Sequence, residues 1–193
     1  MNTVENDTFK EIRPYYDHEV HGVVQEVINN PELISAICQF RFPQLHQSLG
    51  FILRPLIRRK LKSQFANINR VDDFQSQIAS YMNRMIRNST DGFTVSGLDK
   101  LDKTKPYLLV ANHRDIAMDP AFVNYALYQA QRDTVRIAIG DNLLQKPYIS
   151  DLMRLNKSFV VKRNVSGPRA LLAATKLLSQ YIRDSVGSTR NPI

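Results

Sequence analysis

Apolar residues recur every three or four positions through much of the first half of the chain, and this spacing predicts amphipathic helices. The predicted helices span residues 19–28, 45–65 and 71–88. Asn30 followed by Pro31 predicts the start of a further short helix, because asparagine caps helices and proline fits the first helical position. We therefore expect the first half of the chain to be helical.

From residue 93 onward, short apolar runs alternate with longer helical patterns. The apolar runs predict strands over residues 93–97, 107–111, 135–139 and 159–161. Strands that alternate with helices favour a mostly parallel sheet with helices covering both of its faces. The sequence therefore predicts an α/β fold. The change of pattern divides the chain into an N-terminal helical segment, 1–90, and an α/β segment, 91–193.

Composition excludes several classes of protein. The chain has 193 residues, of which 43% are apolar and 23% charged, as in an ordinary globular domain. No apolar stretch is long enough to predict a membrane-spanning helix, and the polar first ten residues do not resemble a secretory signal. Cys38 is the single cysteine, which excludes an internal disulfide and fits a reducing compartment. His18 and His21 lack a third ligand nearby in the sequence, so we predict no metal site.

Positive charge is concentrated in the helical segment. The net charge is +8, and no acidic residue occurs between Glu32 and Asp72. The cations of the predicted 45–65 helix alternate with apolar residues and are Arg54, Arg58, Arg59, Lys60 and Lys62. A basic segment of this kind attracts anionic lipid, nucleic acid or an acidic protein. As an amphipathic helix it suits an anionic membrane surface, and a helical layer packed on the sheet is the alternative.

The residues that follow the 107–111 run carry the most chemistry. His113 comes first, and the carboxylates of Asp115 and Asp119 follow within six positions. Chemistry collects at the carboxyl ends of strands in open α/β sheets, and a histidine oriented by a carboxylate can take a proton from a hydroxyl. His113 is therefore the candidate general base. Asp119 precedes Pro120, so it also fits the cap of the next helix.

These residues resemble a known family. The stretch Asn112-His113-Arg114-Asp115-Ile116-Ala117-Met118-Asp119 is similar to the first block of the glycerolipid acyltransferases, the 1-acylglycerol-3-phosphate acyltransferase superfamily. Within that superfamily it resembles a bacterial subgroup with His-Arg-Asp-Ile in this block. The resemblance implies that His113 is the general base and that Asp119 orients it. The usual spacing has four residues between the two, and this chain has five, so Asp115 is the alternative orienting group.

The 159–161 run and the two cations after it resemble the second block of the same family. That block implies contact with the phosphate of the acceptor, and a guanidinium can bind phosphate through two parallel hydrogen bonds. Arg163 matches the block best, and Lys162 is a weaker candidate. Arg169 lies in the first turn of the last predicted helix, where the helix N-terminus also favours an anion.

The resemblance implies an acyltransferase of phospholipid synthesis, with residues 91–193 as the N-terminal portion of its catalytic domain. A fatty acyl group would pass from an acyl-CoA or acyl carrier protein thioester, as co-substrate, to the hydroxyl of a phosphate-bearing glycerolipid such as lysophosphatidic acid. It implies a peripheral protein on the inner, cytoplasmic face of the plasma membrane. It implies no bound cofactor and no nucleic-acid partner, while acyl carrier protein is a further candidate partner.

Two features leave other functions open. The third and fourth blocks of the family do not occur in these 193 residues, so we expect the C-terminal part of the domain, with part of the phosphate site, to be missing and the fragment to be inactive on that account. One alternative is a basic protein that binds lipid or nucleic acid without catalysis. The other is a hydrolase in which the same histidine and aspartate activate water.

Overall fold

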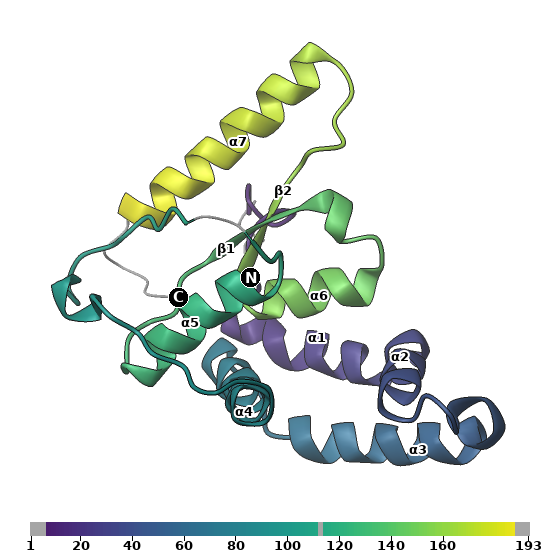
Figure 1. Cartoon of the computed structure of the whole chain (residues 1–193). Coiled ribbons are helices and arrows are strands. Elements are labelled where there is room, and N and C mark those ends of the chain that lie inside the picture. The colour runs from purple at the N-terminus through teal and green to yellow at the C-terminus, as the bar shows by residue number, and fades with distance from the viewer. Residues whose placement is uncertain (1–6, 112–113, 188–193) are drawn as a thin grey trace.

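The computed structural model describes residues 7–111 and 114–187 of the chain. Over these residues it contains seven α-helices and two strands, arranged as Figure 1 shows. In chain order the elements are α1 (Asp17–Asn29), α2 (Pro31–Arg41), α3 (His46–Phe65), α4 (Val71–Ser89), α5 (Met118–Gln129), β1 (Ile137–Gly140), α6 (Pro147–Leu155), β2 (Ser158–Val161) and α7 (Pro168–Gly187). Two short 3-10 helices lie between these elements, Leu98–Lys100 between α4 and α5 and Asp141–Leu143 between β1 and α6.

The helical first half of the chain is confirmed. The predicted 71–88 helix forms as α4, and the 45–65 helix forms as α3 without a break. Asn30 caps α2 as expected, because its side-chain oxygen accepts hydrogen bonds from the backbone N–H groups of Glu32 and Leu33. These predictions succeed because each depends on residues within one or two turns of each other.

The sheet is much smaller than the sequence predicts. β1 and β2 pair in parallel, with Ile137 opposite Ser158 and Gly140 opposite Val161, and α6 connects them. The α/β character is therefore confirmed only in this two-stranded form. The prediction of a mostly parallel sheet covered by helices on both faces is wrong for the part of the chain that the structure describes. Two four-residue strands offer little surface, and most helices pack on one another instead.

The predicted strands at 93–97 and 107–111 do not form. Phe93 is held by side-chain packing, since its ring lies 5.3 Å from that of Phe122 and 5.6 Å from that of Tyr125. In the 107–111 run, Leu108 is 70% exposed and Val110 is 91% exposed. An apolar run becomes a buried strand only where a neighbouring strand satisfies its backbone groups, and β1 and β2 pair with each other.

The main core joins both halves of the chain. Its buried residues come from α1, the end of α3, the segment that follows α3, α4 and α6, and are Val20, Val24, Val27, Ile28, Phe65, Ile68, Val71, Phe74 and Leu155. Leu155, at the end of α6, is fully buried among side chains from the first 75 residues. The N-terminal helices therefore stabilise the β1–α6–β2 unit by burying apolar surface against it. The division of the chain at residue 90 stays a prediction.

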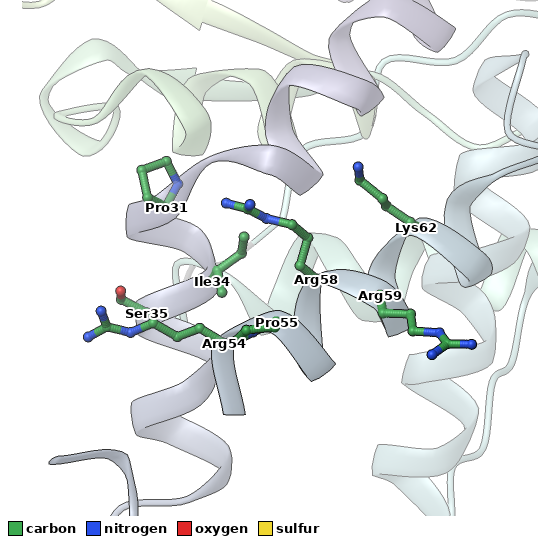
Figure 2. A pocket seen from close by; sticks show the side chains of 8 residues that line it. All are labelled: Pro31, Ile34, Ser35, Arg54, Pro55, Arg58, Arg59 and Lys62. Atoms are coloured by element: carbon green, nitrogen blue, oxygen red, sulfur yellow. The ribbon is translucent and has the colours of Figure 1, made fainter. Parts of the chain in front are cut away.

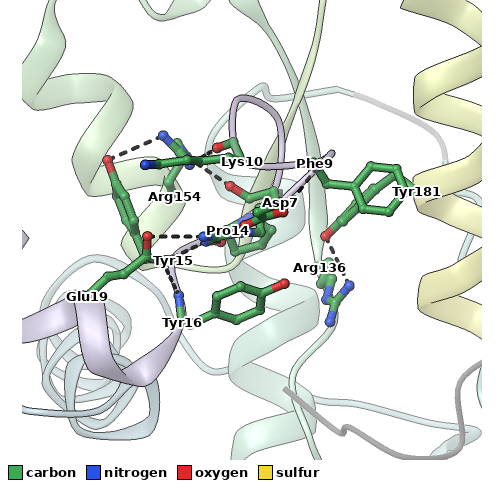
Figure 3. A network of polar contacts seen from close by, with 11 residues as sticks. Asp7, Phe9, Lys10, Pro14, Tyr15, Tyr16, Glu19, Arg136, Arg154 and Tyr181 are labelled. Atoms are coloured by element: carbon green, nitrogen blue, oxygen red, sulfur yellow. Dashed lines mark hydrogen bonds and ion pairs between the residues drawn. The ribbon is translucent and has the colours of Figure 1, made fainter. Parts of the chain in front are cut away.

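Residues 7–16 form an arm that is fixed against β2 and α6 (Figure 3). The carbonyl of Ile12 accepts a hydrogen bond of 2.8 Å from the backbone N–H of Val160. The guanidinium of Arg154 donates to the carbonyls of Arg13 and Lys10. Ile12 also packs with Val160 and Tyr181, which brings α7 onto the same side of the sheet.

Arg13 is the most enclosed charge of this arm, at 4% exposed. Its guanidinium donates to the carboxylate of Asp7 and, through both terminal nitrogens, to that of Glu19, at 2.6 and 3.0 Å. It also lies over the ring of Tyr16, 3.7 Å from the centroid. Burial by itself lowers the pKa of Arg13, but the two carboxylates more than offset it and raise the pKa above its usual value. Two acids therefore hold one buried cation between α1 and the arm.

Candidate functional site

Two carboxylates organise the loop between His113 and α5. Oδ2 of Asp119 accepts hydrogen bonds from the backbone N–H groups of Arg114 and Asp115, at 2.6 and 2.8 Å. Oδ1 of Asp115 accepts from the N–H groups of Ala117 and Met118, at 2.9 and 2.7 Å. Asp115 therefore accepts the N–H groups at the start of α5, the role that the sequence assigns to Asp119, and α5 begins two residues earlier than expected. Asp119 instead accepts hydrogen bonds from the loop residues that precede α5.

His113 and Asn112 lie outside the described residues. The role of His113 as a general base, and the choice of Asp115 or Asp119 to orient it, therefore stay predictions. What the structure adds is the backbone that follows His113. The two residues directly after it both donate their N–H groups to one carboxylate, and that carboxylate belongs to the family-matched Asp119.

Asn124 connects this loop and its helix to the sheet. The side chain, on α5, is 7% exposed. Its amide donates to the carbonyl of Val135 at 3.1 Å and its oxygen accepts from the N–H of Val135 at 2.9 Å. Val135 lies two residues before β1. The acidic loop at the start of α5 is thus positioned relative to β1 by a pair of hydrogen bonds from a buried side chain.

The carboxyl ends of β1 and β2 are joined by Asp141. Its carboxylate accepts hydrogen bonds from the backbone N–H groups of Arg163 and Asn164, at 3.0 and 3.4 Å. Two side chains crowd the preceding residue: a Cβ on Gly140 would lie 2.4 Å from the side-chain oxygen of Asn142 and 3.1 Å from Nε of Arg163, so a larger residue there would displace them. The Arg163 side chain therefore lies across the end of β1, where parallel sheets place their ligands.

The three predicted phosphate contacts do not share one environment. Nζ of Lys162 forms an ion pair with Glu11 of the N-terminal arm, and this contact lowers the pKa of the Glu11 carboxyl. Arg169 lies exposed in the first turn of α7. Arg163 is the one that lies at the joined ends of the strands. Phosphate binding by these residues stays a prediction, and of the three we keep Arg163 as the principal candidate.

Asp141 is the residue of this region that the sequence reasoning missed. The pattern Gly140-Asp141 after the 135–139 run was interpretable only as the end of a strand. Its carboxylate acts on a segment more than 20 positions away, so the sequence does not reveal which residues it contacts. A strand-end aspartate following a glycine, in a predicted parallel sheet, is the signal that points toward such a role.

Asp141→Ala is expected to loosen the backbone at Arg163 and Asn164, because both N–H groups lose their acceptor. Amide hydrogen exchange at these two residues should accelerate about tenfold, as for the loss of one or two ordinary hydrogen bonds. The amide of Val160, inside β2, should keep its protection. Asp133→Ala, which removes an exposed acid beside the same sheet, is the matched control. Unchanged exchange at Arg163 would show that the carboxylate does not hold the strand end.

The five cations predicted to face a membrane all lie on α3 and are all exposed. The same helix exposes four apolar side chains, Leu49, Phe51, Ile52 and Leu56, at 39 to 73%. Charged and apolar groups are therefore both accessible on one helix. Whether this surface meets a membrane stays a prediction. No helix among the described residues is long and apolar enough to cross a bilayer.

A metal site is not evident within residues 7–111 and 114–187, where no group of three or more His, Cys, Asp or Glu side chains gathers. The prediction of no metal therefore stays a prediction for the whole chain, since His113 lies outside these residues.

Comparison with known proteins identifies one relationship. Residues 92–184 match the family model described as Acyltransferase. The match spans 93 of the 193 residues and includes the acidic loop, both strands, Arg163 and most of α7. Neither a curated protein nor a solved structure gives a match. The segment with the joined strand ends and the carboxylate-held loop is thus similar to the acyltransferases. The match supports the glycerolipid acyltransferase superfamily and a general acyltransferase function for this chain.

Proposed function

We propose that the protein transfers a fatty acyl group from a thioester to the hydroxyl of a phosphate-bearing glycerolipid of the lysophosphatidic acid type. The observation that carries the proposal is the match over residues 92–184, because it encloses both the loop after His113 and the strand end at Arg163. The acyl donor is a coenzyme A or acyl carrier protein thioester, and acyl carrier protein is then a transient partner. The reaction belongs to phospholipid synthesis in a bacterial cell.

The proposed chemistry is direct transfer with His113 as the general base. A ring nitrogen of His113 takes the proton of the acceptor hydroxyl, and the oxygen attacks the thioester carbonyl carbon. A C–O bond forms, the C–S bond breaks, and the leaving thiolate takes the proton from the imidazolium. Asp119, or Asp115 as the alternative, orients the ring and stabilises its charged form. No acyl-enzyme forms and no cofactor takes part.

Arg163 is the proposed contact for the acceptor phosphate, with Lys162 and Arg169 as secondary candidates. The side chain of Arg163 lies at the carboxyl end of a parallel pair of strands, where ligands of such sheets bind. A guanidinium there can hold a phosphate through two hydrogen bonds and so place the neighbouring hydroxyl. We propose that the enzyme works on the inner face of the plasma membrane, with α3 toward the lipid.

The proposal is tested by supplying both substrates and identifying the product. The chain is incubated with lysophosphatidic acid in vesicles and a radiolabelled acyl thioester, either acyl-CoA or acyl carrier protein. Label in phosphatidic acid supports the acyltransferase. Label in free fatty acid alone contradicts it and favours a hydrolase, while transfer to monoacylglycerol but not to lysophosphatidic acid contradicts the substrate class.

A further inference from the structure

We propose that a cavity between α2 and α3 binds the phosphate-bearing headgroup of an anionic membrane lipid. The cavity is distinct from the strand ends and from the loop before α5. Its volume is about 390 Å³, and its lining residues are Pro31, Ile34, Ser35, Arg54, Pro55, Arg58, Arg59 and Lys62. This size falls at the lower end of pockets that hold small ligands.

Half of the lining residues are cations. Arg54, Arg58 and Lys62 recur every four positions and so form one row along α3. Figure 2 shows the side chains of Arg54 and Arg58 extending toward α2, whereas Arg59 points the other way. No carboxylate lines the cavity. Over residues 7–111 and 114–187, none of these four cations makes an ion pair or a side-chain hydrogen bond. Their charges therefore remain available to an anion.

The other wall of the cavity adds to this preference. Pro31, Ile34 and Ser35 belong to the first turns of α2, whose N-terminal end carries partial positive charge. The one acid of that turn, Glu32, is directed elsewhere, since its carboxylate accepts a hydrogen bond of 2.7 Å from Nζ of Lys146. Ser35 supplies a hydroxyl at the cavity wall. Cations and a hydroxyl, beside the positive end of a helix, suit a phosphate group.

The exposed apolar side chains of α2 and α3 indicate a lipid as the source of that phosphate. Phe51 is 73% exposed, Leu56 is 57% exposed, and Phe40 at the end of α2 is 88% exposed. Phe51 lies three positions before Arg54 and seven before Arg58, so it shares their face of α3. Nucleic acid or a soluble phosphate would contact the cations but would leave these side chains in water. A lipid surface accommodates both, with apolar groups at the acyl boundary and phosphate in the cavity.

The test is vesicle sedimentation of the full chain without acyl donor, which makes it independent of catalysis. Vesicles of phosphatidylcholine with phosphatidic acid are compared with phosphatidylcholine alone. The double variant Arg58→Gln/Lys62→Gln is expected to bind the anionic vesicles about tenfold more weakly, because each cation near an anionic surface contributes substantially. Arg84→Gln/Arg87→Gln is the control, since it removes the same charge from exposed positions of α4, and should change binding less than about twofold.

A second pair of variants separates the cavity from general surface charge. Ser35→Glu places a carboxylate in the cavity wall, and Ser63→Glu places one on an exposed position of α3 that does not line it. Only Ser35→Glu should weaken binding to the phosphatidic acid vesicles. Equal losses in the two variants, or in the two double variants, would overturn the proposal.

Two further measurements identify the source of the phosphate. Glycerol 3-phosphate, measured by titration calorimetry, should bind far more weakly than the vesicles, because it lacks the apolar contacts. Binding of glycerol 3-phosphate as tight as that of the vesicles would overturn the lipid assignment in favour of a soluble phosphate. Tight binding of an RNA oligonucleotide that the double variant abolishes, with no vesicle binding, would overturn it in favour of nucleic acid.

Discussion

His113→Ala is expected to abolish acyl transfer. A general base contributes about 10²–10⁴-fold to a reaction of this kind, so kcat/KM for lysophosphatidic acid should fall by at least about a hundredfold. The loop after His113 is held by backbone hydrogen bonds to Asp115 and Asp119, which the substitution does not remove. The free energy of unfolding should therefore change little. Product formation is followed with the labelled thioester, and unfolding with urea.

His46→Ala is the matched control for that experiment. His46 begins α3 and is half-buried, and its ring is 2.8 Å from the carbonyl oxygen of Pro43. Its removal should leave kcat/KM within about twofold, as for most surface substitutions. Transfer that survives His113→Ala within a factor of about ten would remove His113 from the mechanism, since a general base contributes more than that. Anion and vesicle binding that persists in an inactive His113→Ala protein would separate catalysis from the basic surface.

Glu19→Ala is expected to lower the free energy of unfolding by about 3 kcal/mol, because removing one partner of a buried ion pair strands the other charge. Arg13 is 4% exposed and would lose two of its hydrogen bonds. The backbone N–H of Tyr16 would lose a third, which is 2.8 Å long in the intact protein. Urea denaturation measures the change. The arm, α1 and β2 share this network (Figure 3), so the substitution should destabilise all three together.

Glu26→Ala provides the comparison on the same helix. Glu26 is exposed on α1, so its removal should change stability by less than about 0.5 kcal/mol. A loss for Glu19→Ala no larger than this would mean that Asp7 alone satisfies Arg13 and that the arm does not depend on Glu19.

The same network makes stability depend on pH. Burial raises the pKa of Glu19, but hydrogen bonds from Arg13 and from the Tyr16 backbone outweigh it and hold the pKa below its ordinary value. A carboxyl whose pKa is lower in the folded state contributes stability above the unfolded pKa of about 4.3, and this contribution is lost as pH falls through the folded value. The stability difference between the wild type and Glu19→Gln should therefore shrink below about pH 4.

Local signals explain what the sequence could predict of the fold. Asn30 and Pro31 start α2 because the capping oxygen and the N–H groups it accepts lie within three residues. The failed strand at 107–111 depended on a distant partner, and hydropathy does not indicate whether one exists. The capping role of Asp119 was misassigned for a related reason. Asp115 and Asp119 both precede the helix, and only the loop geometry decides which carboxylate meets the first turn.

Long-range contacts explain what the sequence could not predict of the candidate site. Lys162 follows a strand and so looked like a phosphate ligand, yet its partner is Glu11, 151 positions earlier in the chain. Asp141 looked like the end of a turn, yet it holds the backbone of Arg163. The cavity on α3 needed the packing of α2 against it. In each case the sequence indicates the chemistry of the residue but not the position of its partner in the fold.

The contact between the N-terminal arm and β2 has a consequence for how the chain folds. The carbonyl of Arg13 accepts its hydrogen bond from Arg154, 141 positions later, and that of Ile12 accepts from Val160. Residues 12 and 13 therefore leave the ribosome long before their partners are synthesised. Contacts of such sequence separation slow folding, because a long loop must close before they form. The helices α1 to α4 can associate early, and the arm closes the structure only after β2 has been synthesised.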